Sequence, residues 1–195
     1  MFVTFEGLDG CGKTTQARLL AESLAADGVD VVSTREPGGT PLGESIRDLV
    51  LHGDHVAPWA EAALYAAARA QHVDQVIRPA LERGATVVCD RYVDSSVAYQ
   101  GVGRGLGLEA VLDLNLAVVG GLLPDRTFLV EIDAETALAR VGHDRDRIER
   151  ATGDFWERVA GAYATLVARY PDRYVVLDGR RSIHDVAEEI RGHVR

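Results

Sequence analysis

The chain has 195 residues and a formal net charge of −9, with a sequence pI near 5.1. This length fits one domain with a substantial core, because a single core usually serves roughly 100 to 200 residues. The acidic balance argues against a general affinity for DNA or RNA phosphates, since such binding needs a basic face. A small anionic substrate is still compatible with this charge, because a local arginine cluster can bind it inside an acidic envelope.

Cysteine content and hydropathy predict the compartment. Cys11 and Cys89 are too few for a disulfide framework, which favours a reducing cytoplasm. The N-terminus opens into an apolar strand pattern without a charged leader or cleavage site. The apolar stretch 57–70 is interrupted by Glu61 and Arg69, so no run approaches the roughly 20 residues of a membrane helix. The sequence therefore predicts a soluble cytoplasmic protein.

Short apolar runs of strand character alternate with segments of helical periodicity. The predicted strands are 2–6, 29–34, 86–89, 127–132 and 174–177. The predicted helices are 13–27, 42–51, 60–83 as one helix or a pair, 108–119, 134–140, 155–170 and 183–193. This alternation predicts an α/β fold, a doubly wound five-stranded parallel sheet flanked by helices, in a single domain 1–195. Ligands of such folds bind at the carboxyl ends of the strands.

Two irregular stretches rich in glycine and charge, 100–106 and 141–153, are predicted to be mobile surface loops. Within the second, residues 141–151 have the composition of a short lid that closes over a nucleotide.

The turn between the first predicted strand and helix carries a phosphate-binding pattern. Its residues are Gly7-Leu8-Asp9-Gly10-Cys11-Gly12-Lys13-Thr14. The glycines let successive backbone N–H groups turn toward a β-phosphate at a helix N-terminus. Lys13 would bridge the β- and γ-phosphates, and the Thr14 hydroxyl would bind Mg²⁺. The alternative, a glycine-rich turn without a ligand, is disfavoured because the match is complete and Lys13 is the only lysine in the chain.

An acid and an arginine follow the third predicted strand. Asp90 at the end of a buried strand can hold Mg²⁺ through water, and Arg91 beside it can face the phosphates. Taken alone, such a pair is more often a solvated ion pair. The phosphate-binding turn opposite it favours a functional role.

The phosphate-binding turn has no cation other than Lys13, so another arginine is expected to neutralise charge on the moving phosphoryl group. The lid segment supplies Arg145 and Arg147 as candidates. The alternative is a solvated face of alternating charge. If one of them has this role, its replacement by alanine should lower kcat by about 10³-fold or more.

Four motifs, in order along the chain, resemble those of the bacterial thymidylate kinases. They are Phe5-Glu6-Gly7-Leu8-Asp9-Gly10, Arg35-Glu36-Pro37-Gly38-Gly39-Thr40, Asp90-Arg91-Tyr92 with Ser95-Ser96 and Ala98-Tyr99-Gln100-Gly101, and Asp146-Arg147-Ile148-Glu149. The resemblance runs from the first predicted strand to the last helix. It implies transfer of the γ-phosphoryl group of ATP to dTMP with Mg²⁺ as cofactor, in a homodimer. It also implies a cis peptide bond between Glu36 and Pro37.

The resemblance implies a role for each matching residue. Asp9 would accept a hydrogen bond from the 3′-hydroxyl of the monophosphate, Tyr65 would stack on thymine, and Tyr99 would pack against the deoxyribose. The expected dTMP-binding residues are Asp9, Arg35, Glu36, Pro37, Arg47, Tyr65, Arg69, Arg91, Ser96, Tyr99 and Gln100. Among these, the arginines expected to grip the phosphate are Arg35, Arg47 and Arg91, and the residues expected at the base are Arg69, Ser96 and Gln100.

The resemblance also implies the donor site and the catalytic set. The expected ATP-binding residues are Gly7, Leu8, Asp9, Gly10, Cys11, Gly12, Lys13, Thr14, Thr15, Arg140 and Arg180. The expected catalytic residues are Lys13, Arg91, Asp9, Arg145 and Arg147, and the expected metal-binding residues are Thr14 and Asp90.

Helical spacing agrees with the predicted base site. Residues at i and i+4 share a helix face, so Tyr65 and Arg69 can present a stacking ring and a donor together. The alternative is a core tyrosine without a ligand. The family more often has phenylalanine at this position, and a tyrosine hydroxyl must find a partner or water.

Two other functions are compatible with parts of the sequence. The acceptor could be a different nucleoside monophosphate, although Tyr99, Arg69 and Gln100 favour thymine. The chain could instead be a GTP-binding switch or a motor ATPase. The only asparagine is Asn115, inside a predicted helix, so the Asn-Lys-x-Asp guanine motif cannot exist and the switch is disfavoured.

Overall fold

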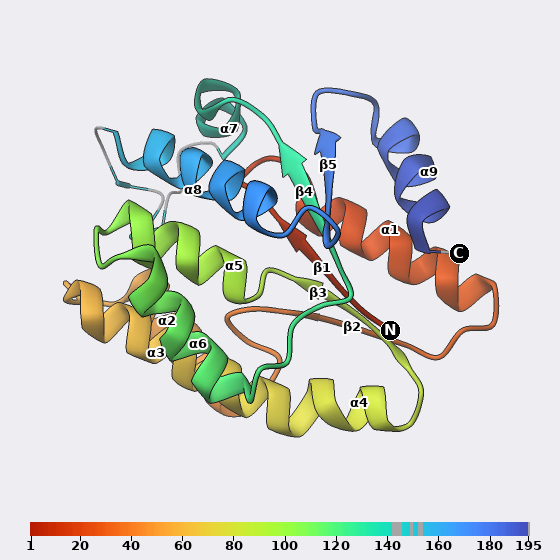
Figure 1. Ribbon diagram of the computed structural model, residues 1–195, viewed down its shortest axis with the longest axis horizontal. Coiled ribbons are helices and arrows are strands. Elements are labelled where there is room, and N and C mark those ends of the chain that lie inside the picture. Colours follow the sequence, from red (N-terminus) through yellow and green to blue (C-terminus); the bar gives the residue numbers. More distant parts are fainter. Residues whose placement is uncertain (142–145, 149, 152–153, 195) are drawn as a thin grey trace.

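The computed structural model describes residues 1–141, 146–148, 150–151 and 154–194. Its strands form one parallel sheet in the order β2-β3-β1-β4-β5 (Figure 1). The strands are β1 (Phe2–Glu6), β2 (Val31–Arg35), β3 (Thr86–Asp90), β4 (Arg126–Glu131) and β5 (Tyr174–Asp178). Every residue of β1 and β3 is buried, because inner strands of a parallel sheet are covered on both faces. The predicted α/β fold is confirmed.

Helices cover the sheet on both sides. They are α1 (Lys13–Ala26), α2 (Pro41–His52), α3 (Pro58–His72), the π-helical η1 (Val73–Ile77), α4 (Arg78–Glu82), α5 (Val93–Ser96), the π-helical η2 (Val97–Gly103), α6 (Leu108–Val119), α7 (Ala134–Val141), α8 (Phe155–Arg169) and α9 (Ile183–Val194). α1 packs against α9 and against β1, β2 and β3, whereas α5, η2 and α8 gather on the other side of the strands (Figure 1). Across the described ranges, we find no helix with both the length and the hydropathy to span a membrane.

The segment before α6 differs from the prediction. Residues 93–103 form α5 and η2, which the sequence analysis did not predict, and the expected surface loop at 100–106 is wrong at its start. Gln100 is 2% exposed. A Cβ on Gly103 would lie 2.7 Å from the Phe155 ring, so α8 packs directly on the backbone there. Glycine serves close packing at this position and not flexibility.

The phosphate-binding turn joins β1 to α1 as predicted. Gly7 has a φ of +137°, and a Cβ there would lie 2.5 Å from the carbonyl oxygen of Val130 on β4. Only glycine therefore allows the turn to leave the sheet at this point. Phe5 of β1 is paired in register with Asp90 of β3, which sets Asp90 beside the turn. The phosphate-binding turn and Asp90 therefore lie together at this edge of the sheet.

Candidate active site

Lys13 lies at the start of α1 with its ammonium group folded back over the turn. Its Nζ donates to the Leu8 carbonyl oxygen at 3.1 Å and to Asp9 Oδ1 at 3.2 Å. The residue is 5% exposed, so its side chain is buried. The Leu8 carbonyl oxygen and the Asp9 carboxylate lie against the ammonium group. They shield it from water and hold it in place.

Thr14 and Asp90 are adjacent, as a shared magnesium site requires. The Thr14 hydroxyl donates to Asp90 Oδ2. The other carboxylate oxygen, Oδ1, is buried and accepts no hydrogen bond from the described residues. An orphaned carboxylate oxygen beside a hydroxyl fits Mg²⁺, which takes few protein ligands and completes its shell with phosphate and water. The described residues hold no group of three or more His, Cys, Asp or Glu placed to bind a metal, so a metal here would depend on such outside oxygens.

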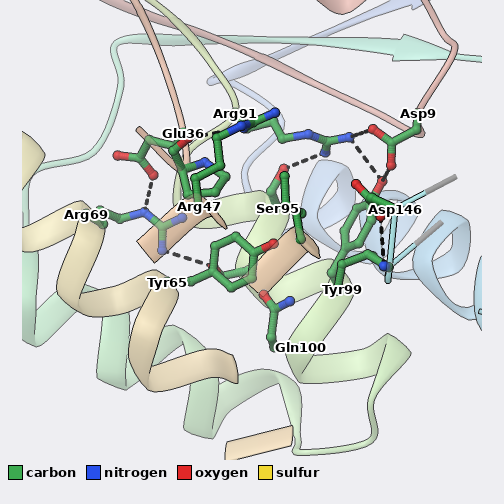
Figure 2. A pocket seen from close by; sticks show the side chains of 14 residues that line it. Asp9, Glu36, Arg47, Tyr65, Arg69, Arg91, Ser95, Tyr99, Gln100 and Asp146 are labelled. Carbon is green, nitrogen blue, oxygen red and sulfur yellow. Dashed lines mark hydrogen bonds and ion pairs between the residues drawn. The ribbon is translucent and has the colours of Figure 1, made fainter. Parts of the chain in front are cut away.

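Arg91 connects the phosphate-binding turn to the residues expected to bind the monophosphate (Figure 2). Its guanidinium group donates to Asp9, to the Gly7 carbonyl oxygen at 3.2 Å, to Ser95 Oγ at 2.9 Å and to the Tyr99 hydroxyl at 3.2 Å. Burial opposes ionisation of Asp9, but the charges of Arg91 and Lys13 outweigh it and hold the pKa of Asp9 well below its usual range. Asp9 is therefore an anion fixed between two cations.

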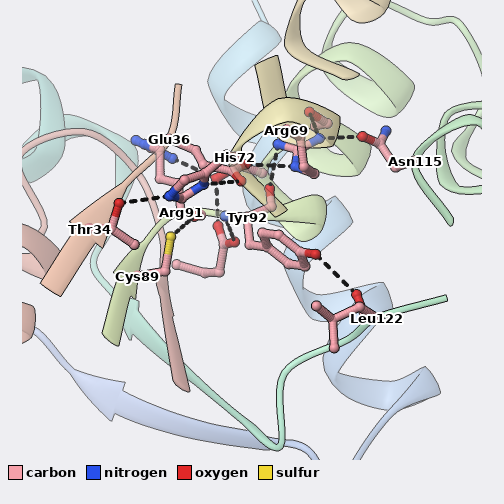
Figure 3. Close-up of polar contacts among 12 residues, drawn as sticks. Thr34, Glu36, Arg69, His72, Cys89, Arg91, Tyr92, Asn115 and Leu122 are labelled. Atoms are coloured by element: carbon pink, nitrogen blue, oxygen red, sulfur yellow. Dashed lines mark hydrogen bonds and ion pairs between the residues drawn. The ribbon is translucent and has the colours of Figure 1, made fainter. Parts of the chain in front are cut away.

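The backbone of Arg91 is in a conformation that L-residues rarely adopt. Its φ is +70°. Its N–H donates to the Phe5 carbonyl oxygen at 2.9 Å, and its carbonyl oxygen accepts from the Cys89 thiol at 3.1 Å (Figure 3). Such a conformation costs on the order of 1 to 3 kcal/mol and persists where the surroundings impose it. Here it aims the guanidinium group at the phosphate-binding turn.

A pocket opens beside Asp9 and Arg91 (Figure 2). Its lining residues are Asp9, Glu36, Pro37, Arg47, Leu51, Tyr65, Arg69, Arg91, Ser95, Ser96, Tyr99, Gln100, Asp146 and Ile148. All but one of the residues expected at the monophosphate lie here. Leu51, Ser95, Asp146 and Ile148 also line the pocket without having been predicted, although Ser95, Asp146 and Ile148 belong to the motifs given above.

Arg35 is the exception. Its Nη2 donates to Glu44 Oε2 at 3.0 Å and its Nη1 to the Pro37 carbonyl oxygen at 2.9 Å, so it does not line the pocket. Glu44 from α2 competes for this guanidinium group. Arg47 does line the pocket and donates to the same carbonyl oxygen at 3.1 Å. The Glu36–Pro37 peptide bond is cis, which confirms that prediction.

Arg69 is held in a buried network (Figure 3). It is 2% exposed. Its Nε donates to Glu36 at 2.6 Å, its Nη1 donates to Ser96 at 3.0 Å and to Asn115, and its Nη2 donates to the Tyr92 carbonyl oxygen at 3.0 Å. These four contacts use four of the five N–H donors of the guanidinium group, so one N–H has no partner among the described residues, and Arg69 lines the pocket.

Glu36 carries this network further into the core. Its Oε1 lies 2.9 Å from Nδ1 of His72, whose Nε2 lies 2.7 Å from the Thr34 hydroxyl. The sequence analysis expected Glu36 as a dTMP-binding residue. The structure shows in addition that Glu36 fixes Arg69, which a helix-face argument cannot predict.

Tyr65 and Tyr99 form two walls of the pocket (Figure 2). Tyr99 packs edge-on against Phe155 and Trp156, with ring centroids 6.1 and 6.0 Å away, and its hydroxyl donates to Asp9 at 3.2 Å. Burial, with the charge of Glu61, raises the pKa of Tyr65, so its hydroxyl stays protonated. That hydroxyl makes no hydrogen bond to the described residues, which leaves it for water or a ligand.

A second pocket lies on the other side of the phosphate-binding turn. It is lined by Cys11, Gly12, Thr15, Gln16, Val130, Arg140, Gly179, Arg181, Ile183 and Val186. Arg140 donates to the Gly179 carbonyl oxygen at 3.2 Å, close to where the sequence analysis expected it. Arg180 instead pairs with Asp178 at 2.8 Å, and its neighbour Arg181 lines the pocket. Arg180, held by Asp178, therefore does not line this pocket, whereas Arg181 does.

Part of the expected lid is described. Arg145 lies outside the described residues. Arg147 donates from Nε to the Val50 carbonyl oxygen at 2.9 Å and from Nη2 to Glu61 at 2.6 Å, and Ile148 is 4% exposed. Residues 146–148 are therefore anchored on α2 and α3, at the pocket that Asp9 and Arg91 line. For these three residues the expectation of an open surface loop is wrong, since Ile148 finds an apolar contact and Arg147 finds acceptors.

Glu6 lies beneath the site and has no contact with either pocket. Its buried carboxylate accepts from the Tyr92 N–H at 2.8 Å, from the Tyr163 hydroxyl at 3.0 Å and from Ser95. Burial, with the nearby charge of Asp94, raises the pKa of Glu6 to about 7. Glu6 thereby fixes Ser95, which accepts from the Arg91 guanidinium group.

Replacing Glu6 with glutamine is expected to change how stability depends on pH. The folded protein holds the Glu6 proton up to about pH 7 whereas the ordinary pKa is 4.5, so ionisation destabilises the fold as pH rises through this window. The free energy of unfolding of Glu6→Gln, relative to the parent, should therefore rise between pH 5 and pH 8 by on the order of 1 to 3 kcal/mol. Urea denaturation at both pH values measures it, with exposed Glu22→Gln as control. An equal difference at both pH values would contradict the expectation.

The strand–turn–helix unit with Lys13 and Thr14, Asp90 on the adjoining strand, and two pockets that share the turn define a P-loop nucleotide kinase. A family model described as thymidylate kinase matches residues 5–190. This match covers most of the chain, and the chain belongs to the thymidylate kinase family.

Relatives and a solved structure agree with this assignment. The chain is 54% identical to a thymidylate kinase of Leifsonia xyli subsp. xyli, covering 98% of this chain and 92% of that protein. It is 50% identical to a thymidylate kinase of Pelotomaculum thermopropionicum, covering 93% of this chain and 86% of that protein. The crystal structure of thymidylate kinase from Ehrlichia chaffeensis superposes with a TM-score of 0.85 at 35% identity, covering 100% of this chain and 97% of that one.

Proposed function

We propose that this enzyme transfers the γ-phosphoryl group of ATP to dTMP, giving dTDP for deoxythymidine nucleotide synthesis, with Mg²⁺ as cofactor. Membership of the thymidylate kinase family supports the acceptor. The observation that carries the proposal is the convergence of Asp9, Arg91 and Tyr99 at one end of a pocket whose other end holds Tyr65 and Gln100. One end suits a sugar phosphate and the other suits a flat base.

In the acceptor pocket, Arg47 and Arg91 would bind the 5′-phosphate, and Arg35 would join them on leaving Glu44. Tyr65 would stack on the base. The spare N–H of Arg69 and the carbonyl oxygen of Gln100 would meet the base edge.

Two further contacts concern the sugar. Asp9 lines the pocket, where its Oδ2 already accepts from the Tyr99 hydroxyl, and it would also accept from the 3′-hydroxyl group. The Tyr99 ring, fixed by Phe155 and Trp156, would leave no room for a 2′-hydroxyl. The same rigidity would hold the acceptor in one orientation for in-line transfer.

In the donor pocket, backbone N–H groups of the turn and Lys13 would bind the ATP phosphates, while Arg140 and Arg181 flank the site of the nucleoside. Thr14 and Asp90 would hold Mg²⁺, whose positive charge offsets charge on the phosphates when it is bound. Lys13 and Arg91 would stabilise the charge that spreads over the transferred phosphoryl group.

We also propose that the enzyme is a cytoplasmic homodimer that binds neither nucleic acid nor membranes. Leu49 on α2 and Trp59 on α3 are large apolar side chains that are more than half exposed, at 56% and 51%. Together with the exposed Ala63 and Ala67 of α3 they offer apolar surface that a second copy of the chain could cover.

A coupled assay tests the proposed reaction. With ATP and Mg²⁺, dTMP should be turned over faster than dCMP, dAMP or dGMP, and chelation of Mg²⁺ should stop turnover. Equal turnover of another monophosphate would reject the thymidylate acceptor. Rapid nucleotide hydrolysis without an acceptor would favour a switch or motor instead.

The lid arginine is tested separately. We expect Arg147→Ala to lower kcat by about 10³-fold or more with a smaller effect on the KM for dTMP, if Arg147 leaves Glu61 and meets the phosphoryl group on closure. Steady-state kinetics of Arg147→Ala, Arg145→Ala and the double variant measure this. A raised KM with unchanged kcat would mean that Arg147 only anchors the segment on the acceptor pocket. The catalytic cation would then be Arg35, Arg47 or Arg91.

A further inference from the structure

Glu61 is a buried carboxylate that the proposed mechanism does not use. It lies on α3 and is 1% exposed. It accepts from Gln100 Nε2 at 2.9 Å, from Arg104 at 3.2 and 3.3 Å, and from Arg147 at 2.6 Å. Its donors come from η2, from the turn that follows η2 and from the segment after α7. A buried charge with this many donors is fully compensated, and its geometry is tightly fixed.

Glu61 determines which way round the Gln100 amide lies. Both oxygens of the Glu61 carboxylate accept from arginine N–H groups, and a carboxylate can only accept hydrogen bonds, so Gln100 turns its NH₂ group toward Glu61. The other end of the amide, the carbonyl oxygen, accepts no hydrogen bond from the described residues, and Gln100 lines the acceptor pocket (Figure 2). The pocket is thereby offered an acceptor at this position and not a donor.

A second polar group of the same pocket has the opposite character. Arg69 lines the pocket with one unused N–H, and arginine can only donate. A donor at Arg69 and an acceptor at Gln100 in one pocket would complement the thymine edge, which presents the O4 acceptor next to the N3–H donor. Cytosine presents a 4-amino donor next to the N3 acceptor, so both contacts would be mismatched.

We propose that Glu61 is a specificity-determining positioning residue, which fixes the Gln100 amide so that the pocket admits a pyrimidine with an N–H at ring position 3 and rejects cytosine. This inference rests on the proposed contact between Gln100 and the base. Arg104 and Arg147 pair with Glu61, but neither contacts the Gln100 amide in the described structure.

Glu61→Gln tests the inference with almost no change in shape. The new amide has one oxygen and one NH₂ group in place of two oxygens. Oε2 of Glu61 accepts from Arg147 at 2.6 Å, its shortest contact, and from Arg104 at 3.3 Å, whereas Oε1 accepts from Gln100 at 2.9 Å and from Arg104 at 3.2 Å. The new oxygen should take the side of Oε2, which turns the new NH₂ group toward Gln100. The Gln100 amide then accepts from the new NH₂ group best if it rotates by half a turn. In that orientation the NH₂ group of Gln100 faces the pocket.

The measurement is the ratio of kcat/KM for dTMP to kcat/KM for 5-methyl-dCMP. These substrates share the 5-methyl group and differ at positions 3 and 4 of the ring. We expect Glu61→Gln to lower this ratio by about tenfold or more. Arg104→Gln is the matched control, because it removes both hydrogen bonds from Arg104 to Glu61 but leaves the carboxylate facing Gln100. The ratio of kcat/KM values for Arg104→Gln should stay within about twofold of that of the parent.

A structural role would give a different result. If Glu61→Gln slows both substrates equally and leaves the ratio unchanged, the inference is overturned, and a thermal melt shows whether lost stability is the cause. Gln100→Ala separates this failure from failure of the proposed base contact. If Gln100→Ala leaves the ratio unchanged, the base contact itself is wrong. If Gln100→Ala lowers the ratio and Glu61→Gln does not, only the role of Glu61 is wrong.

The double variant provides a last check. When Gln100 is already alanine, Glu61→Gln should cause no further change in the ratio, because the two residues act through one amide. Additive effects on the ratio would mean that Glu61 acts on the base by another route, which also overturns the inference.

Discussion

Lys13→Ala is expected to lower kcat by about 10³-fold or more while the fold persists. The ammonium group would lie between the β- and γ-phosphates, where the charge of the transition state develops. Its loss leaves Asp9 paired with Arg91, so the turn keeps its main ionic contact. Single-turnover transfer of phosphate measures the effect, and circular dichroism checks the fold. A kcat within tenfold of the parent would remove Lys13 from the catalytic set.

Lys13→Arg is the informative control for this prediction. It keeps the positive charge, but a planar guanidinium group is wider than an ammonium group and cannot occupy the same ring of acceptors formed by Leu8 and Asp9. We expect it to stay close to Lys13→Ala in rate. Because the chain has one lysine, an amine-reactive ATP analogue should label Lys13 and the N-terminus alone, and ATP should block the labelling of Lys13.

Arg91→Ala is expected to lower kcat/KM for dTMP by about 10³-fold or more. Arg91 contacts both the phosphate-binding turn and the acceptor pocket, so its loss should affect acceptor binding and the chemical step together. Arg91 lowers the pKa of Asp9 more than Lys13 does, so the pKa of Asp9 should rise in Arg91→Ala.

The matched control is Arg83→Ala. Arg83 pairs with Asp30 at the surface, far from either pocket, and surface ion pairs contribute on the order of 0 to 1 kcal/mol. We expect its kcat/KM to stay within about twofold of the parent. Steady-state kinetics of both variants decide the matter. A loss below tenfold for Arg91→Ala would show that Arg91 serves the turn and not the reaction.

Several features of this protein follow from short-range signals in the sequence. The alternation of strands and helices predicts the parallel sheet, because each signal is set by the periodicity of a few consecutive residues. The phosphate-binding turn and Asp90 at the end of β3 follow similarly, since the carboxyl ends of parallel strands meet at one edge. Tyr65 and Arg69 share a helix face and both line the acceptor pocket as predicted.

Other features depend on which side chains pair with each other in the folded protein, and this is decided by the packing of the elements. Arg35 is drawn away from the pocket by Glu44, and Arg180 by Asp178. Gln100 stands in a glycine-rich stretch that composition assigns to the surface, yet the packing of α8 against η2 buries it.

Glu61 shows the difference most plainly. In the sequence it is one acid within an apolar helix, where it serves as evidence against a membrane segment. In the fold it meets donors 39, 43 and 86 residues away in the chain. Sequence by itself determined the strands, the helices other than α5 and η2, and the chemistry of the phosphate-binding turn, because these signals are local. Only the tertiary structure decided which buried charge orients which amide, because a buried acceptor must be satisfied by whatever donors the packing brings to it.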